Sequence, residues 1–328
     1  MTTTTGAVPR IRTYGDPSAG CLAGLDAALA MLVEARRIVR VGGDEPADIV
    51  HTIGPVTMPT GPAVPRVHTV DRIVLRNGRL VPAGWWLRRE GRCAAGTSVL
   101  LAHGQMAGRL LVDAGLAPGE RVHCLPLLAP LGCMRPGPGA RRAVRDQLGV
   151  APGVRLVLSA DAANAGSRTA GWEHLLRCTG RRDVTVASIC PAATAPGPYS
   201  VRLASGRWLS EPLDLAGLLA AADLYVAAGT TLEACNPAAA AVACGVPVTA
   251  VTTDSVAELV LSAGAGFVVP ARAVSVAQAV VAQLDSGLPL RRPSGSPPEH
   301  QLKVAELAHG LLMIYRRVLC ASAVSGAA

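Results

Sequence analysis

The chain has 328 residues, enough for two domains that each bury a core. Its net charge of +8 comes from arginine, because Lys303 is the only lysine among the 31 basic residues. These arginines are spread through every segment and only 3% of the residues are aromatic, so the sequence lacks the basic tail and the stacking platforms typical of nucleic-acid binders. The composition therefore argues against nucleic acid as a partner, and it is typical of a GC-rich genome of the actinobacterial kind.

The nine cysteines are odd in number, dispersed, and without a C-x-x-C pair that would predict a zinc or redox site. We expect them to be small buried thiols in a reducing cytoplasm. The first residues, MTTTTGAVPR, lack the charged leader and apolar run of a signal peptide. Acidic residues and prolines interrupt the long apolar stretches, so none is expected to span a bilayer. The sequence thus predicts a cytoplasmic protein.

The first half of the chain alternates extended and helical segments. Helices are expected at AGLDAALAMLVEARR, at the basic WWLRREGRC and at QMAGRLLVDAG. Strands are expected at PRIRTYG, RIVRVGGD, ADIVHTIG, PRVHTVDRIVL, GTSVLLAHG and ERVHCLP. Strands that alternate with helices predict a parallel sheet with crossover connections.

A stretch dense in glycine and proline, LAPLGCMRPGPGA at residues 128–140, is the best domain boundary, and a second alternating series follows it. Its expected strands are VRLVLSAD, DVTVASIC, DLYVAAG, VPVTAVTT and GAGFVVPAR, with VRLASGRW a strand or a turn. Its expected helices are GWEHLLRCTG, LDLAGLLAAA, PAAAAVACG, SVAELVLSAG and SVAQAVVAQLDSG. RRPSGSPPEH is expected to be a surface linker before the amphipathic helix QLKVAELAHGLLMIYRRVLC. The pattern predicts an α/β protein of two αβα sandwiches and a closing helix.

Ligands of open parallel sheets bind beyond the carboxyl ends of the strands, where helix N-termini present free N–H groups. This rule selects the residues that directly follow each expected strand. They are residues 51–52, 69–71 and 103–104 in the first half, and 161–168, 191–198, 229–233 and 252–255 in the second.

One long segment carries a resemblance to a known family. Residues 221–271 read AADLYVAAGTTLEACNPAAAAVACGVPVTAVTTDSVAELVLSAGAGFVVPA: an aspartate before a strand, a small-residue loop, a Glu, an Ala-rich helix, Cys-Gly-Val-Pro-Val and Glu-Leu-Val. This order resembles the GT-B glycosyltransferases, in particular the retaining family-four group. The resemblance covers nearly the whole chain, strongly over residues 99–285 and weakly before residue 45.

The resemblance implies a GT-B architecture, in which two Rossmann-like αβα domains face each other across a cleft and a C-terminal crossover helix closes the molecule. The implied parts are a short acceptor-binding domain over 1–130, a donor-binding domain over 137–290 and a helix over 298–322 that packs back on the N-terminal domain. The implied donor is a nucleoside diphosphate sugar, used as a co-substrate, and the acceptor is a hydroxylated small molecule, lipid-linked carrier or polysaccharide. No further cofactor is implied. Relatives neutralise the leaving diphosphate without a metal, consistent with the absence of a D-x-D motif.

In the implied donor site, Glu233 matches the first Glu of the family and is expected near the hydroxyls of the donor sugar. Thr230 and Thr231, in the small-residue loop before it, are expected to contact the donor as well. Arg168 and Gly171 stand near the family's phosphate-binding Lys and Gly, and a guanidinium suits phosphate oxygens. For Glu233 the alternative is an acid placed in the first turn of a helix by the helix dipole alone; for Arg168 it is a surface position.

Two departures weaken the match on the donor side. The family's second Glu, which contacts the nucleotide ribose, falls at Ala240, and the spacing from Glu233 to Gly245 is one residue short. Asp161 also stands where an Arg is common. If the donor binds, something other than a carboxylate at position 240 must hold the ribose.

On the acceptor side, many relatives carry Thr-x-His where this chain has Thr69-Val70-Asp71, so Asp71 and the nearby His68 are the catalytic candidates. Asp71 fits a general base or a ligand for a sugar hydroxyl, and equally a helix cap. Gly20 and Gly24, within residues 14–24, are the candidates for close approach to the donor phosphates.

His51 is expected to be structural and His103 to contact loop backbone. Both follow or end expected strands in the first half of the chain.

Two other functions remain open from the sequence: a catalytically inactive partner with the same fold, favoured by Ala240 and Asp161, and a sugar-nucleotide epimerase, for which few acids are available. WWLRREGR also leaves open a peripheral contact with an anionic membrane face, against the alternative of a buried or interdomain segment.

Overall fold

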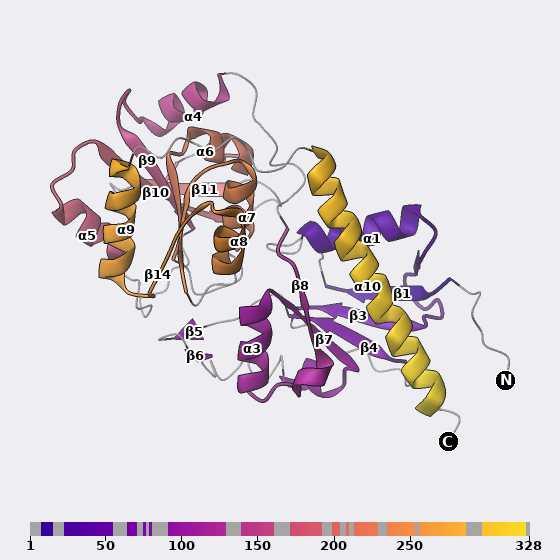
Figure 1. Ribbon diagram of the computed structural model, residues 1–328. Helices are drawn as coiled ribbons and strands as arrows, with labels where there is room; N and C mark the ends of the chain where they lie inside the picture. The colour runs from indigo at the N-terminus through magenta and orange to yellow at the C-terminus, as the bar shows by residue number, and fades with distance from the viewer. Residues whose placement is uncertain are drawn as a thin grey trace.

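The computed structural model shows two α/β domains built around separate parallel sheets, with a long helix at the C-terminus (Figure 1). It describes residues 8–15, 23–54, 64–70, 75–76, 79–80, 91–128, 139–160, 171–191, 199–203, 208–209, 213–228, 235–252, 256–286 and 297–325. The α/β class predicted from the sequence is confirmed. The predicted boundaries at residues 130 and 137 fall within 129–138, outside the described residues, and remain predictions.

The first sheet is entirely parallel and its strand order is β2-β1-β3-β4-β7-β8. Its strands are β1 (Arg10–Tyr14), β2 (Val39–Arg40), β3 (Ile49–Ile53), β4 (Arg66–Thr69), β7 (Val99–His103) and β8 (Val122–Leu125). Every residue of β3 and β7 is buried, as expected of strands covered on both faces. A separate antiparallel pair joins β5 (Leu75–Arg76) and β6 (Arg79–Leu80).

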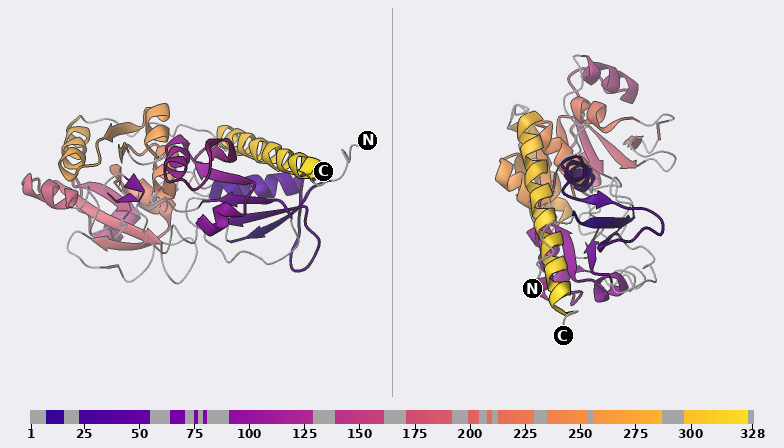
Figure 2. Two further views of the ribbon diagram at one scale, coloured as in Figure 1. Left: turned by 90° about the horizontal axis from the view of Figure 1, so that it is seen from below. Right: turned by 90° about the vertical axis from the view of Figure 1, so that its right-hand side faces the viewer.

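Helices α1 (Ala23–Glu34) and α10 (Pro297–Ser325) pack against each other, and α3 (Gln105–Asp113) packs against β7 and β8, with the short 3-10 turn η2 (Gly119–Arg121) between α3 and β8. Figures 1 and 2 show α10 running along the N-terminal domain beside α1. The last segment of the chain therefore completes the core of the first domain.

The second sheet has the order β11-β10-β9-β12-β13-β14. Its strands are β9 (Arg155–Ala160), β10 (Val184–Pro191), β11 (Tyr199–Leu203), β12 (Leu224–Ala227), β13 (Val248–Val251) and β14 (Gly266–Val269). All its pairs are parallel except β10 with β11, which is antiparallel. No described helix separates β10 from β11, so a short connection returns the chain in the opposite direction.

Helices cover both faces of this sheet. They are α4 (Ala140–Leu148), α5 (Trp172–Cys178), α6 (Leu215–Ala221), α7 (Cys235–Ala243), α8 (Val256–Ala263) and α9 (Ala273–Asp285). One face of β9 and β12, with Val157 and Val226, packs with Trp172 and Val276 from α5 and α9. The opposite face belongs to a larger buried cluster that also includes residues of the first domain and α10, so the two domains share a continuous apolar core.

Some details differ from the sequence-based expectations. Helix α10 begins at Pro297, inside the expected linker, because proline fits the first turn of a helix. Cys178 and Cys320 are exposed, although we expected buried thiols. Within the part of the chain that the structure describes, no helix combines the length and apolar character needed to cross a bilayer.

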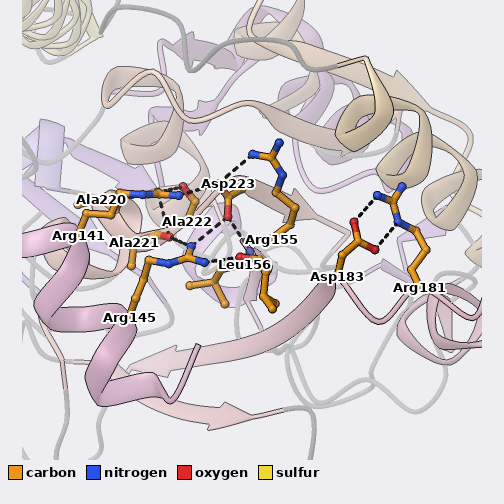
Figure 3. Close-up of polar contacts among 11 residues, drawn as sticks. Arg141, Arg145, Arg155, Leu156, Arg181, Asp183, Ala220, Ala221, Ala222 and Asp223 are labelled. Carbon is orange, nitrogen blue, oxygen red and sulfur yellow. Dashed lines mark hydrogen bonds and ion pairs between the residues drawn. The ribbon is translucent and has the colours of Figure 1, made fainter. Parts of the chain in front are cut away.

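Asp223 precedes β12 at the amino edge of the second sheet and gathers several donors around one carboxylate (Figure 3). It accepts hydrogen bonds from the Leu156 N–H at 2.7 Å, from Arg141 at 2.6 Å and from Arg145 at 3.1 Å. Arg155 lies 3.6 Å away, and the Asp223 side chain is only 8% exposed. A single acid thus ties α4 to β9 and β12.

The same arginines also hold the end of α6. Arg141 donates to the carbonyls of Ala220, Ala221 and Ala222, and Arg145 donates to that of Ala221. These carbonyls have no partner within the helix, so the cations satisfy them and interact favourably with the helix dipole. The cluster explains the aspartate before this strand by stability alone.

Burial by itself would raise the pKa of the Asp223 carboxyl, but the Leu156 N–H and the guanidiniums of Arg141 and Arg145 together lower that pKa below its ordinary value. Because the folded-state pKa is the lower one, the stabilisation is fully present above about pH 4. It is lost as the pH falls through the lowered pKa.

We expect Asp223→Ala to lower the free energy of unfolding by about 3 kcal/mol, because it leaves buried cations without their partner. Asp183→Ala is the matched control: Asp183 pairs with Arg181 at 2.7 Å, but its side chain is 51% exposed (Figure 3). Urea denaturation of both variants measures the difference. Equal losses for the two would show that the Asp223 cluster has no special role.

Candidate functional site

The carboxyl edges of the two sheets meet at one polar contact. The N–H groups of Gln105 and Met106, in the first turn of α3, donate to Oε2 and Oε1 of Glu258 at 3.0 and 2.6 Å. Helix α3 follows the end of β7, and α8, which carries Glu258, follows the end of β13. Figure 1 shows these helices facing each other where the domains adjoin. This is the region that the rule for open parallel sheets selects for a ligand.

A glycine turn lies at the same edge of the first sheet. Gly15 directly follows β1 with φ 96°, and a Cβ at this position would lie 2.2 Å from the Ile53 carbonyl oxygen. Only glycine fits, so Gly15 lets the chain turn closely over the end of β3. It belongs to the predicted phosphate-approach segment 14–24, but the sequence reasoning singled out Gly20 and Gly24 instead.

Gly24 lies in α1, where a Cβ would be 2.8 Å from Cβ of Leu128. Its missing side chain therefore serves the packing of α1 on Leu128. An approach of Gly24 to a phosphate stays a prediction, and Gly20 lies outside the described residues.

His51 links two strands and the last helix through a buried hydrogen-bond chain. Its Nδ1 lies 2.7 Å from the Tyr315 hydroxyl on α10, and its Nε2 lies 2.7 Å from Oγ1 of Thr69 on β4. Burial, with repulsion from His68 and His103, lowers the pKa of His51 to about 3. Burial also raises the pKa of Tyr315. Both groups are therefore neutral, and His51 has the structural role expected of it.

The predicted catalytic histidine, His68, lies on the other face of the sheet. Side chains alternate along a strand, so Thr52 and His68 point away from the face that holds His51 and Thr69. Nδ1 of His68 lies 2.8 Å from Oγ1 of Thr52, and both residues are fully buried. This burial was not expected from the sequence, and the predicted catalytic role of His68 stays a prediction. The other catalytic candidate, Asp71, lies outside the described residues.

His103 ends β7 on the same face as His51 and Thr69. It is 2% exposed, and neither ring nitrogen forms a hydrogen bond with the described residues. Burial lowers its pKa to about 4, and the Pro126 carbonyl opposes this shift only in part. The Pro126 carbonyl, in the loop after β8, thus acts on the charge of the ring, but its geometry does not make a hydrogen bond with either ring nitrogen.

The donor side is described in part. Gly171 precedes α5 in a left-handed conformation, φ 86°, with open space where a Cβ would stand. Arg168, Thr230, Thr231 and Glu233 lie outside the described residues, so their predicted roles remain predictions.

Ala240 is fully buried within α7, as are its neighbours Ala239 and Ala241. In the family that the sequence resembles, the Glu that contacts the ribose falls at position 240. The structure instead shows a methyl group packed in the core, where a carboxylate would lose its water without a partner. Ala240 thus contributes to the packing of this helix, and its match to the ribose-binding Glu of the family stays a prediction.

Among the described residues, no group of three or more His, Cys, Asp or Glu side chains is arranged to hold a metal ion. Metal-independent chemistry remains a prediction.

No model of a known protein family matches the chain. No curated protein matches its sequence either. Solved structures do match over its length. HepE from Anabaena, in complex with UDP and glucose, aligns with a TM-score of 0.55 and 13% identity over 98% of this chain and 100% of that one. A glycosyltransferase from Rickettsia africae aligns with a TM-score of 0.57 and 11% identity over 94% and 98%.

Sucrose-phosphate synthase from Thermosynechococcus elongatus aligns with a TM-score of 0.55 and 16% identity over 84% of this chain and 74% of that one. The chain has the GT-B fold. The predicted arrangement of two Rossmann-like domains with a C-terminal helix is therefore confirmed. At these identities the similarity establishes the GT-B fold and no particular activity.

Two residues of this region were missed by the sequence reasoning as site residues. Glu258 was noticed only as part of the Glu-Leu-Val match, and Tyr315 only as part of the closing helix. Their partners are 153 and 264 positions away in the chain, so no local pattern could connect them.

The two buried histidines predict how stability depends on pH. The pKa values of His51 and His103 in the fold lie below the ordinary 6.5, so the unfolded chain binds protons first as the pH falls. Stability is full above about pH 6.5, and at pH 5 each histidine should have removed about 2 kcal/mol of unfolding free energy.

We expect His103→Leu to remove half of this acid sensitivity, with little loss at pH 7.5 because the ring makes no hydrogen bond with the described residues. Urea denaturation at pH 7.5 and pH 5 tests it. A variant whose stability falls between these pH values as much as that of the native chain would contradict the buried, neutral state of His103.

Proposed function

We propose that this chain is a glycosyltransferase that moves a sugar from a nucleoside diphosphate sugar to a hydroxyl group of an acceptor. The observation that carries the proposal is the meeting of two parallel sheets at their carboxyl edges, through Glu258, in a GT-B fold. The same fold holds UDP and glucose in HepE, whose whole length this chain covers. Closure of two domains over a donor and an acceptor brings them together and excludes water.

The second domain would hold the donor. Glu233 accepts hydrogen bonds from the sugar hydroxyls, and Thr230 and Thr231 line the loop before it. Arg168 binds the diphosphate with its planar guanidinium. Gly171, in a left-handed conformation, directly precedes α5. Arginine and helix N-termini neutralise the charge that develops on the leaving diphosphate, without a metal.

The first domain would hold the acceptor. Asp71 takes the proton of the acceptor hydroxyl or orients that hydroxyl. Thr69, two residues before Asp71, is held in place at the end of β4 by its hydrogen bond with His51. On the opposite face of the sheet, His68 of β4 forms a hydrogen bond with Thr52 of β3. The family resemblance further suggests retention of the anomeric configuration.

A second candidate is a partner protein that keeps the fold without transferring sugar. The observation in its favour is Ala240, which is buried in α7 where relatives carry a ribose-binding Glu. A protein of this kind would fold in the same way and bind no nucleotide.

Thermal unfolding in the presence of UDP, GDP and TDP separates the two candidates. A nucleotide present at 100 times its Kd should add about 2.7 kcal/mol to the free energy of unfolding. We expect one of the three to raise the Tm. The absence of a shift with all three would contradict the transferase and leave the partner protein.

Once a nucleotide is found, Glu233→Ala tests the sugar site. We expect this variant to weaken binding of the sugar nucleotide by tenfold or more while leaving the bare nucleotide nearly unchanged, because the loss of hydrogen bonds to the sugar is worth about 1.4 kcal/mol or more. Glu306→Ala, on the exposed side of α10, is the control. Equal weakening of both ligands would remove Glu233 from the sugar site.

A further inference from the structure

The N-terminus of α3 lacks a cap from its own domain. The residue before the helix is Gly104, which has no side chain, and the first turn contains no acid. The first N–H groups of a helix have no partner within it and normally take one from a Ser, Thr, Asp or Asn at this position. Within its own sequence, α3 therefore begins with unsatisfied donors at the carboxyl edge of the first sheet.

Glu258 supplies the missing cap from the other domain. Its two carboxylate oxygens each accept one N–H, from Gln105 at 3.0 Å and from Met106 at 2.6 Å. Hydrogen bonds to a carboxylate are about twice as strong as neutral ones, and the positive end of the helix dipole adds to them. One side chain thus makes two directed bonds between the domains.

The location of this contact sets it apart from an ordinary helix cap. A cap within one domain stabilises that domain alone. Glu258 belongs to α8, which follows β13, and its partners belong to α3, which follows β7. The contact therefore exists only when the carboxyl edges of the two sheets face each other. Because each carboxylate oxygen accepts a different N–H group, the two hydrogen bonds together restrict the relative position of the two domains.

The Glu258 carboxylate is partly buried, and its charge also acts on the strand beside α3. Burial raises the pKa of the Cys124 thiol on β8, and the carboxylate of Glu258 raises it further, while the Gly108 backbone and the Arg109 guanidinium of α3 act in the opposite direction. The charge of Glu258 therefore acts on β8 of the first domain as well as on the two N–H groups of α3.

We propose that Glu258 is a positioning residue, which holds the two domains in the arrangement needed for transfer by capping α3 across the interface. It touches neither donor nor acceptor in this role. The proposal rests on the proposed glycosyltransferase function for its consequence, but the contact itself can be measured without any substrate.

Gln105→Pro removes one of the two donors and little else. Proline suits the first position of a helix, and Gly104 has ψ 156°, which is compatible with a following proline. Gln105→Ala is the matched control because it keeps the backbone N–H. Glu258→Gln removes the charge from the acceptor side, and Glu306→Gln repeats that change at an exposed glutamate of α10.

Three measurements on these variants of the full chain test the proposal. Hydrogen exchange of the peptide that begins α3 should quicken in Glu258→Gln and not in Glu306→Gln. Small-angle X-ray scattering should show a larger radius of gyration for Glu258→Gln and Gln105→Pro than for their controls. With the nucleotide sugar that the native chain uses, kcat should fall about tenfold or more in Glu258→Gln, since hydrogen bonds to charged groups are involved, while the Kd of the bare nucleotide should change less than twofold.

The kcat of the double variant Gln105→Pro with Glu258→Gln should lie within about twofold of the kcat of Glu258→Gln, because the two changes act on the same contact. Unchanged exchange and scattering in Glu258→Gln would overturn the proposal, since the contact would then not hold the domains. Faster exchange with an unchanged kcat would overturn the positioning role and leave a simple cap. If the native chain binds no nucleotide, the proposed function fails, and scattering alone decides whether Glu258 positions the domains.

Discussion

Parallel pairing is the constraint on which the rest of this structure depends. It sends the carboxyl ends of nearly all strands to one edge of each sheet, and the two edges meet where Glu258 caps α3. The opposite edge has the contrary character: Asp223 there is enclosed by arginines and its bonds serve stability. The division between the edge proposed to bind a ligand and the edge that stabilises the domain follows from the direction of the strands.

The first domain depends on the last helix of the chain. Tyr315 of α10 reaches His51, and His51 reaches Thr69, so three segments distant in sequence share one buried chain of hydrogen bonds. Such a chain is stabilising only when its groups are satisfied, and neutral His51 and Tyr315 meet that condition. Helix α10 in this way holds the end of β4, which precedes Asp71. Glu258 contacts the start of α3, which follows the neighbouring strand β7.

The fold could be predicted from the sequence because buried parallel strands appear as apolar runs between amphipathic helices, as in ADIVHTIG and GTSVLLAHG. The orientation of β11 could not, since it depends on a pairing partner, and neither could the start of α10 within a proline-rich stretch. For the candidate site, the rule of carboxyl ends selected the edges at which the two sheets face each other. It could not reveal that His68 faces the core, that Ala240 packs in α7 or that Glu258 bonds across the domains, because each depends on contacts between distant segments.

The most direct test of the central claim is hydrogen exchange mapped along the chain with and without a nucleotide sugar that binds. We expect slower exchange in the segments at both carboxyl edges: residues 229–235 and 253–258 of the second domain, and residues 14–24 and 69–71 of the first. We expect no change around Asp223 at the amino edge. Protection confined to the amino edge, or to one domain alone, would contradict a ligand held between the two sheets.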